Sequence, residues 1–344
     1  MSEYLVYIFF ILGFILLLKG ADLLVHGSCS IAKKFNVPDI IVGLTIVSLG
    51  TSAPELFVNV LSSLEGNAGI GIGNIFGSNI ANILLILGIS AIIFPLPVHR
   101  NTVLSEIPFS LTATLLVGFL ANAALFFEIS LDSLSLITRT LYLDRYDGII
   151  LLLFFLLFMA YIIKITNEQA DREKMNMILG RTEKKEPDFS FGELPVKKSV
   201  IYIILGIFGL FLGGKWVVDG AIHVAKNFGF SDSFIGLTII AIGTSLPELV
   251  TSATAAFKKK ADIAVGNVVG SNIFNMLWIL GLSAVIKPLP FDLISNFDLM
   301  IIIIASALLI FSMVLGKKYV IERWNGIVFI VIYIGYLIFL VLRG

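Results

Sequence analysis

The feature that most constrains this chain is an internal repeat at an offset of 193 residues. The segment GTSAPEL at 50–56 returns as GTSLPEL at 243–249. A second segment, GNIFGSNIANILLILG at 73–88, returns as GNVVGSNIFNMLWILG at 266–281, and the alignment needs no gap between the two matches. Because one structural unit is thus encoded twice, we expect two equivalent halves, as in many transporter folds.

Composition places both halves in a membrane. The 344 residues are 58% hydrophobic and only 14% charged, with a mean hydropathy of +0.99, whereas a soluble domain is about 45–50% apolar and about 25% charged. Apolar runs of about 18 or more residues recur, which is long enough to span a bilayer as a helix and too long and continuous for β-spans. The first residues lack a basic segment and a cleavage site, so we interpret them as the first span and not as a cleaved signal. We therefore predict an all-α membrane protein.

Ten transmembrane helices are predicted, and one long polar segment at 166–197 divides them into two groups of five. The first half is 1–165 and the second is 198–344, with this segment as the linker. Because five is an odd number, the second half must run inverted relative to the first, as in secondary transporters. The predicted helices are 4–28, 38–63, 69–94, 103–127, 147–165, 198–225, 232–256, 262–286, 295–315 and 323–342.

Positive charge sets the predicted orientation, because cytoplasmic loops carry an excess of Lys and Arg. With the linker on the cytoplasmic side, 17 of the 24 Lys and Arg residues lie inside and 5 lie outside. Both termini then face outward, and we predict a multi-pass protein of the cell membrane (the plasma or inner membrane). The net charge of zero gives no indication of a nucleic-acid partner, and the single cysteine, Cys29, excludes an internal disulfide and a Cys-based metal site.

Pro54 and Pro247 occupy equivalent positions in the two copies of GTSxPEL. A proline inside a helix removes one hydrogen bond and clashes with the carbonyl four residues earlier, here that of Gly50 or Gly243. Irregular backbone at membrane depth is tolerated only where it is buried in protein or lines a watery cavity. The alternatives are a simple kink and a loosened turn whose freed carbonyls become oxygen ligands; the carboxylate that follows each proline favours the second.

Glu55 and Glu248 follow these prolines directly. A charge at mid-bilayer costs about 2.5–3.5 kcal/mol on the insertion scale, so two facing glutamates require a compensating cation or protonation. Calcium takes about 6–8 oxygens from carboxylates, carbonyls and amides, sodium can use the same oxygens, and no Cys or paired His indicates a soft metal. The alternative is a protonated, hydrogen-bonded pair. Further hydroxyl and carbonyl oxygens are offered one turn earlier by Thr51, Ser52, Thr244 and Ser245.

The second motif supplies the other wall of the predicted site. Ser78 and Asn82 are four residues apart and share one helix face, as do Ser271 and Asn275 in the other half. We interpret these pairs as cation ligands or as side chains that hold the ligands. The glycines of the motif have the small-xxx-small spacing that allows close helix packing: Gly73, Gly77, Gly266 and Gly270.

Two further sets of polar residues are ambiguous from sequence. Asn74 and Asn267 lie two turns before the asparagines that end the motif, and a structural hydrogen-bonding role is as well supported as a functional one. Lys19 and Asp22 are three residues apart, which predicts a local ion pair near a helix end.

Paired GTSxPEL and GNxxGSNIxN segments on an inverted five-plus-five arrangement resemble the alpha-repeats of the cation/calcium exchanger superfamily. The resemblance is to its prokaryotic sodium/calcium exchanger branch, covers essentially the whole chain, and assigns the alpha-1 motif to 43–97 and the alpha-2 motif to 236–290. It implies ten helices, of which the second, third, seventh and eighth surround a diamond of cation sites. It also implies that the first and sixth helices slide against this core.

The resemblance also implies roles for individual residues. Asn275 departs from the pattern, because some prokaryotic relatives and the potassium-dependent branch have an aspartate there. The site then holds only two carboxylates, which makes potassium co-transport less expected and places protonation of the central site in doubt. The matched positions are Glu55 and Glu248 as calcium ligands, Thr51, Ser52, Thr244 and Ser245 as hydroxyl and carbonyl ligands, Ser78 and Ser271 as sodium ligands, Asn82 as the central amide, and Ser48 and Ala241 as backbone-carbonyl donors.

The function that the resemblance implies is secondary-active sodium/calcium antiport, with calcium extruded by alternating access at a midplane site and three sodium ions moved per calcium. Proton/calcium exchange, or exchange of another divalent cation, is the alternative, although GTSxPEL favours sodium. A channel or sensor is less favoured because no pore helix or filter is evident, and no nucleophile or hydrolase constellation indicates an enzyme. We expect calcium, sodium and the lipid bilayer as the partners, with no cofactor and no obligatory protein partner.

Overall fold

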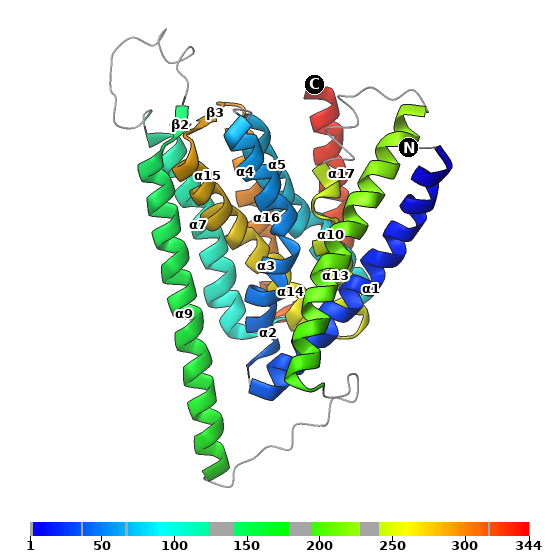
Figure 1. The fold of residues 1–344 in the computed structure, drawn as a ribbon. Coiled ribbons are helices and arrows are strands. Elements are labelled where there is room, and N and C mark those ends of the chain that lie inside the picture. Colours follow the sequence, from blue (N-terminus) through cyan, green and yellow to red (C-terminus); the bar gives the residue numbers. More distant parts are fainter. Residues whose placement is uncertain are drawn as a thin grey trace.

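The computed structural model describes residues 3–35, 37–65, 68–123, 125, 141–178, 194–227, 241–315 and 317–343. These residues are predominantly helical (Figure 1). Two small antiparallel sheets of two strands each tie helix ends together. In one, β1 (Leu96–Pro97) pairs with β4 (Val320–Ile321), and in the other, β2 (Leu141–Leu143) pairs with β3 (Leu289–Phe291).

Eight helices in the described part of the chain are long and apolar enough to cross a membrane. Three of them contain a π-helical segment, a wide turn that is frequent at functional sites. The eight are α1 (Glu3–Phe35), α5–η2–α6 (Ala68–Ala81, Asn82–Ile86 and Leu87–Ile93), η3–α7 (Thr102–Glu106 and Ile107–Ala121), α9 (Arg145–Ile178), α10 (Val196–Asn227), α14–η5–α15 (Ala261–Ile273, Phe274–Ile279 and Leu280–Ile286), α16 (Ser295–Val314) and α17 (Arg323–Arg343).

A ninth candidate span is broken. The segments Asp39–Thr51 and Ala53–Leu61 meet at an angle of 45°, as expected for a helix interrupted before a proline. The elements of this span are α2 (Asp39–Val42), η1 (Gly43–Val47), α3 (Ser48–Thr51) and α4 (Ala53–Glu65). The predicted span at 232–256 lies partly outside the described residues, which include α12 (Ala241–Gly243) and α13 (Leu246–Phe257) from it.

Two helices run farther than their hydropathy predicts. The first helix continues past residue 28 to Phe35, and the basic side chains of Lys33 and Lys34 in its last turn suit the negative end of the helix dipole. The fifth continues past 165 into the polar linker as far as Ile178. The sequence there is rich in good helix formers of mixed charge, so the helix persists after the apolar run ends.

The helices form a buried centre and an exposed periphery. In the apolar 18-residue window of α5–η2–α6 and in that of α14–η5–α15, 78% of the residues are buried, whereas only 22% are buried in the window of α9. The helices α1 and α10 pack side by side in opposite directions at one flank, and α9 packs against α15 at the other (Figure 1). The start of α1 and the end of α17 lie at one end of the molecule, and α9 ends and α10 begins at the opposite end, which we call the linker end (Figure 1).

Glycines bring the backbones of α1 and α10 into direct contact. A Cβ added to Gly20 would lie 2.8 Å from the Leu210 nitrogen and 2.9 Å from the Gly206 oxygen, and one added to Gly213 would lie 2.8 Å from the Gly13 oxygen. Small residues at such positions permit the close helix packing that is typical of membranes. We call this contact the glycine seam; its members recur every seven residues on each helix, as Gly13, Gly20 and Gly27 on α1 and Gly206, Gly213 and Gly220 on α10.

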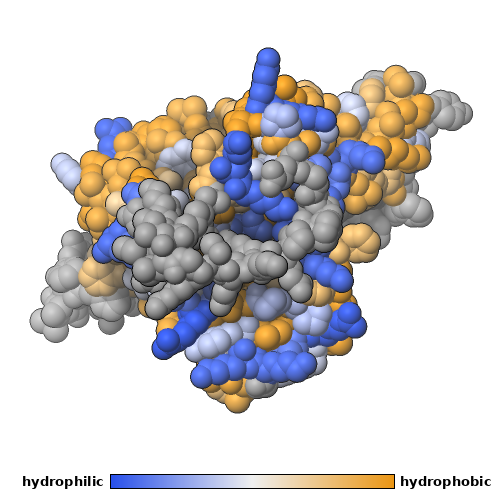
Figure 2. Space-filling view, turned by 90° about the horizontal axis from the view of Figure 1, so that it is seen from below, coloured by the Kyte–Doolittle hydropathy of each residue, from blue (hydrophilic) through white to orange (hydrophobic). Residues whose placement is uncertain are grey.

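Ion pairs join the halves at the linker end. Asp22 on α1 pairs with Lys258 at the end of α13, so the prediction of a local pair with Lys19 was wrong. The partner is 236 residues away and reaches Asp22 only because α13 packs against α1. Beside it, Lys260 Nζ lies 3.4 Å from an Asp39 carboxylate oxygen. Viewed from this end, hydrophilic residues gather on the face while the flanks are hydrophobic (Figure 2).

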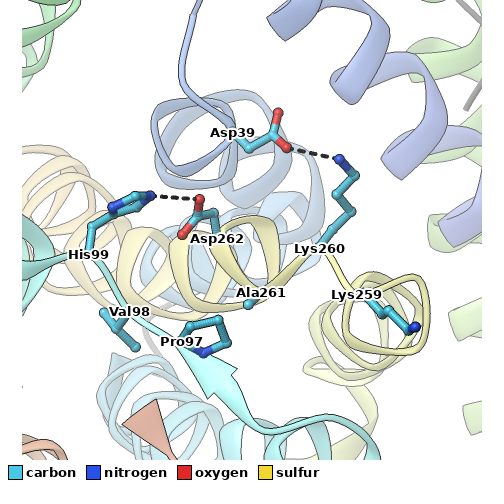
Figure 3. A pocket seen from close by; sticks show the side chains of 8 residues that line it. All are labelled: Asp39, Pro97, Val98, His99, Lys259, Lys260, Ala261 and Asp262. Carbon is cyan, nitrogen blue, oxygen red and sulfur yellow. Dashed lines mark hydrogen bonds and ion pairs between the residues drawn. The ribbon is translucent and has the colours of Figure 1, made fainter. Parts of the chain in front are cut away.

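A pocket of about 340 Å³ opens at the same end (Figure 3). His99 and Asp262 line one wall and form an ion pair, in which His99 Nε2 lies 3.2 Å from an Asp262 carboxylate oxygen. None of its lining residues belongs to the predicted cation site. They are Asp39, Pro97, Val98, His99, Lys259, Lys260, Ala261 and Asp262.

Candidate cation-binding site

The break in the second span places Glu55 in the first turn of α4. Pro54 has no N–H to donate to the carbonyl of Gly50, so one helical hydrogen bond is missing at this point. The helix resumes at once, because the Leu56 nitrogen donates to the Ser52 oxygen at 3.1 Å. Glu55 is therefore held by a fixed backbone, and only 1% of it is exposed.

Glu248 has the equivalent position in the second half. The helix α12 ends at Gly243 and α13 begins at Leu246, with Pro247 at its start and Glu248 in its first turn. The Leu249 nitrogen donates to the Ser245 oxygen at 3.0 Å, so the backbone is regular beyond the break. Glu248 is likewise only 1% exposed.

A chain of hydroxyls from both halves reaches Glu248. Ser52 Oγ lies 3.0 Å from Glu248 Oε1 and 3.0 Å from Ser271 Oγ. A hydroxyl carries one proton, so Ser52 donates to the carboxylate and accepts from Ser271. The carboxylate of one half is thus held by a serine of the other half.

Glu55 also meets a chain of two serine hydroxyls, although its direct donor comes from its own half. Ser78 Oγ lies 3.4 Å from Glu55 Oε1, and Ser245 Oγ donates to Ser78 Oγ at 3.1 Å. The serine pair 245–78 corresponds to the pair 52–271 under the offset of 193. The structure therefore brings together the glutamates and serines of both motifs.

Four buried oxygens of the predicted ligand side chains accept no hydrogen bond within the described part of the chain. They are Glu55 Oε2, Glu248 Oε2, Asn82 Oδ1 and Asn275 Oδ1. Leaving a buried acceptor unpaired costs about 1–3 kcal/mol, and more for a charged group. Carboxylate and amide oxygens without donors are the ligands that a hard cation prefers, so the set fits a cation such as calcium or sodium.

The amides of Asn82 and Asn275 are oriented by two asparagines that the sequence analysis did not single out. Asn82 Nδ2 donates to Asn272 Oδ1 at 2.9 Å, and Asn275 Nδ2 donates to Asn79 Oδ1 at 2.9 Å. A signal was available, because both copies of the motif contain the sequence GSNI. Asn82 is the first residue of η2, and Asn275 lies in η5.

The threonines of GTSxPEL are engaged by Asn74 and Asn267. Thr51 Oγ1 donates to Asn267 Oδ1 at 3.0 Å, and Thr244 Oγ1 donates to Asn74 Oδ1 at 3.1 Å. Each bond joins one half to the other. These contacts support the structural reading of the two asparagines, which hold the threonines in place.

The two positions expected to offer backbone carbonyls differ in how fully they are described. Ser48 is buried at the start of α3; its carbonyl accepts from the Ser52 nitrogen at 2.9 Å and lies 3.3 Å from Thr51 Oγ1. Ala241 is the first residue of α12. The ligand role of both residues stays a prediction.

Comparison with known proteins agrees with this geometry. The family model described as "Sodium/calcium exchanger protein" matches residues 5–164 and 198–342, on either side of the linker. The chain is 33% identical to sodium/calcium exchanger MaX1 of Methanosarcina acetivorans, covering 97% of this chain and 98% of the relative. It is 37% identical to inner membrane protein YrbG of Escherichia coli K12, covering 82% and 80%.

A solved structure of the sodium-calcium exchanger NCX_Mj, soaked with Na⁺ and Ca²⁺, superimposes with a TM-score of 0.74 at 33% identity. The match covers 97% of this chain and 97% of that one. The fold and the family match define a multi-pass membrane protein of a transporter family. The chain belongs to the sodium/calcium exchanger family.

Proposed function

We propose that this protein is a secondary-active antiporter that extrudes Ca²⁺ in exchange for Na⁺ at a site formed by Glu55 and Glu248. The observation that carries the proposal is the set of four buried, unpaired oxygens contributed by both halves. A solved relative whose title names Na⁺ and Ca²⁺ has the same fold. Buried acidic residues in transmembrane segments commonly mark ion pathways.

Calcium and sodium compete for the same oxygens in this proposal. Calcium bridges the two glutamates, and the amide oxygens of Asn82 and Asn275 complete its surroundings. Sodium ions take neighbouring positions that are rich in hydroxyls, with Ser78 and Ser271 among the ligands. Two carboxylates balance one divalent ion, so calcium and a full set of sodium ions exclude each other.

Alternating access follows from the inverted arrangement that we propose for 1–165 and 198–344. The opposite directions of α1 and α10 support this inversion (Figure 1). The glycine seam makes these two helices a tightly packed pair that can move as one body against the buried centre. We place the linker in the cytoplasm and both termini outside, as the distribution of Lys and Arg favours.

The coupling ion is tested by calcium-45 uptake into proteoliposomes in which sodium, potassium and proton gradients are imposed separately. We expect uptake driven by an outward sodium gradient, with no requirement for potassium. Uptake driven by the pH gradient alone would identify proton/calcium exchange instead. Flux without any counter-ion would indicate a channel and contradict the proposal.

A further inference from the structure

We propose that Asn79 and Asn272 are positioning residues that fix which end of a neighbouring amide faces the cation. The inference rests on the proposed function, because it concerns the same site. The amides to be fixed are those of Asn82 and Asn275. Asn79 and Asn272 contribute no ligand themselves; they act by accepting a hydrogen bond.

An amide side chain has an oxygen at one end and an NH₂ group at the other, and the two ends have nearly the same size. Packing therefore does not decide which end points into the site. Only the oxygen can bind a cation, and a flipped amide would direct two N–H donors at it. A buried hydrogen-bond partner that only accepts from the amide selects the productive orientation.

Asn79 is anchored to main chain. Its Nδ2 donates to the Asn272 carbonyl oxygen at 3.3 Å, and a main-chain carbonyl always accepts. This contact leaves Asn79 Oδ1 directed at Asn275, whose Nδ2 donates to it at 2.9 Å. Asn275 Oδ1 is then left unpaired and available to a cation.

Asn272 performs the equivalent task for Asn82. Its Oδ1 accepts from Asn82 Nδ2 at 2.9 Å, which leaves Asn82 Oδ1 unpaired. The pairs 82–272 and 275–79 are interchanged by the offset of 193, so each half orients the amide of the other. All four side chains are at most 3% exposed, so water does not compete for these bonds.

A substitution of the proposed ligand Asn82 by aspartate gives the discriminating test. Both terminal atoms of a carboxylate are oxygens, so either one can face the cation. An Asn82→Asp variant presents an oxygen in either orientation and does not depend on Asn272. If Asn272 acts only through the amide of Asn82, the effect of Asn272→Leu disappears in the Asn82→Asp background. A purely structural role would leave the same loss in both backgrounds.

The experiment measures the calcium concentration that half-saturates the thermal stabilisation of the purified, detergent-solubilised protein. Partners of metal ligands typically change affinity about 10–100-fold when removed, so we expect Asn272→Leu to weaken calcium at least about tenfold. Asn272→Asp keeps the accepting oxygen and should retain wild-type affinity or better. In the Asn82→Asp background, Asn272→Leu should change the affinity less than about threefold.

A matched control removes a partly buried amide pair elsewhere. Asn122 Nδ2 donates to Asn296 Oδ1 at 2.7 Å, and the reverse bond is 2.8 Å. Asn122→Leu should lower the unfolding temperature and leave the calcium concentration at half-saturation unchanged.

The outcomes separate this inference from the proposed function. If calcium stabilises the wild type and Glu55→Gln abolishes that effect, the site exists. An unaltered calcium affinity in Asn272→Leu, or an equal loss in both backgrounds, would then overturn the positioning role alone. If calcium does not stabilise the wild type at all, both the proposed function and this inference are overturned.

Discussion

At the scale of single residues, the proposed site is a set of buried oxygens in which each glutamate is hydrogen-bonded by a serine hydroxyl. Each glutamate uses one oxygen to accept from a serine hydroxyl and keeps the other unpaired. The serine hydroxyls stabilise the charged form of the carboxylates without neutralising them. This division leaves a charged oxygen for the ion.

We predict that Ser52→Ala weakens calcium binding about tenfold, because a hydrogen bond to a charged group contributes about 1.5–3 kcal/mol. Ser245→Ala should have a smaller effect on the Glu55 side, because Ser245 donates to Ser78, and Ser78 is the direct donor to Glu55. Isothermal titration of the purified protein with calcium checks both variants. Unchanged affinity in Ser52→Ala would show that its bond to Glu248 does not contribute to the bound state.

At the scale of elements, α1 and α10 are held together by backbone contact. A Cβ on Gly20 or Gly206 would lie under 3.0 Å from main-chain atoms of the partner helix, which cannot move aside as a flexible side chain does. The pair can therefore transmit a movement as a unit, and its integrity is a requirement for alternating access in our proposal.

We expect Gly206→Ala to destabilise the protein by about 1–3 kcal/mol, the usual cost of overpacking a close contact. Gly335→Ala on α17 is the control, because no heavy atom lies within 4 Å of its added Cβ among the described residues. Thermal unfolding in detergent compares the two variants. Equal unfolding temperatures would show that the seam tolerates a side chain and is not a close-packed contact.

Among the elements, the sequence predicts spans and equivalences better than it predicts partners. Residues 295–315 are predicted as a span, and α16 runs from Ser295 to Val314. The offset of 193 relates the contacts Asn82–Asn272 and Asn275–Asn79 to each other. It did not indicate that Asp22 pairs with Lys258, because that contact depends on which helices pack together and not on local spacing.

The same limit applies within the site. The glutamates and serines were predicted from chemistry that is costly in a membrane and therefore conspicuous in sequence. The repeated GSNI singles out Asn79 and Asn272, but their partners could not be predicted, because these depend on how α5 and α14 meet at the two residues. The π-helical turns at Asn82 and Asn275 were not predicted from the sequence either.

At the scale of the whole molecule, ion pairs close the linker end between segments of the two halves. His99 precedes α7 and Asp262 begins α14, and the pair faces a pocket that also contains Asp39 and Lys260 (Figure 3). The hydrogen bond and the charge of Asp262, with a further contribution from Glu106, raise the pKa of His99 above its ordinary value of about 6.5.

Because the pKa of His99 is raised in the folded protein, the pair stabilises the fold fully below about pH 6.5 and loses this contribution as pH rises through the raised pKa. His99→Gln should lower the unfolding temperature at acidic pH and match the wild type at alkaline pH. Thermal unfolding across this pH range measures the difference. A difference of the same size at every pH would contradict the assignment to His99.

The central claim is that one site, made by Glu55 and Glu248 from opposite halves, carries both ions. The most direct measurement is sodium-gradient-driven calcium-45 uptake into proteoliposomes containing the wild type, Glu55→Gln or Glu248→Gln. Each substitution removes one of the two charges that balance calcium, so we predict that either one reduces the initial rate at least about 100-fold, consistent with 3–5 kcal/mol for breaking a buried ionic interaction. Sodium-dependent uptake that survives either substitution would contradict the account.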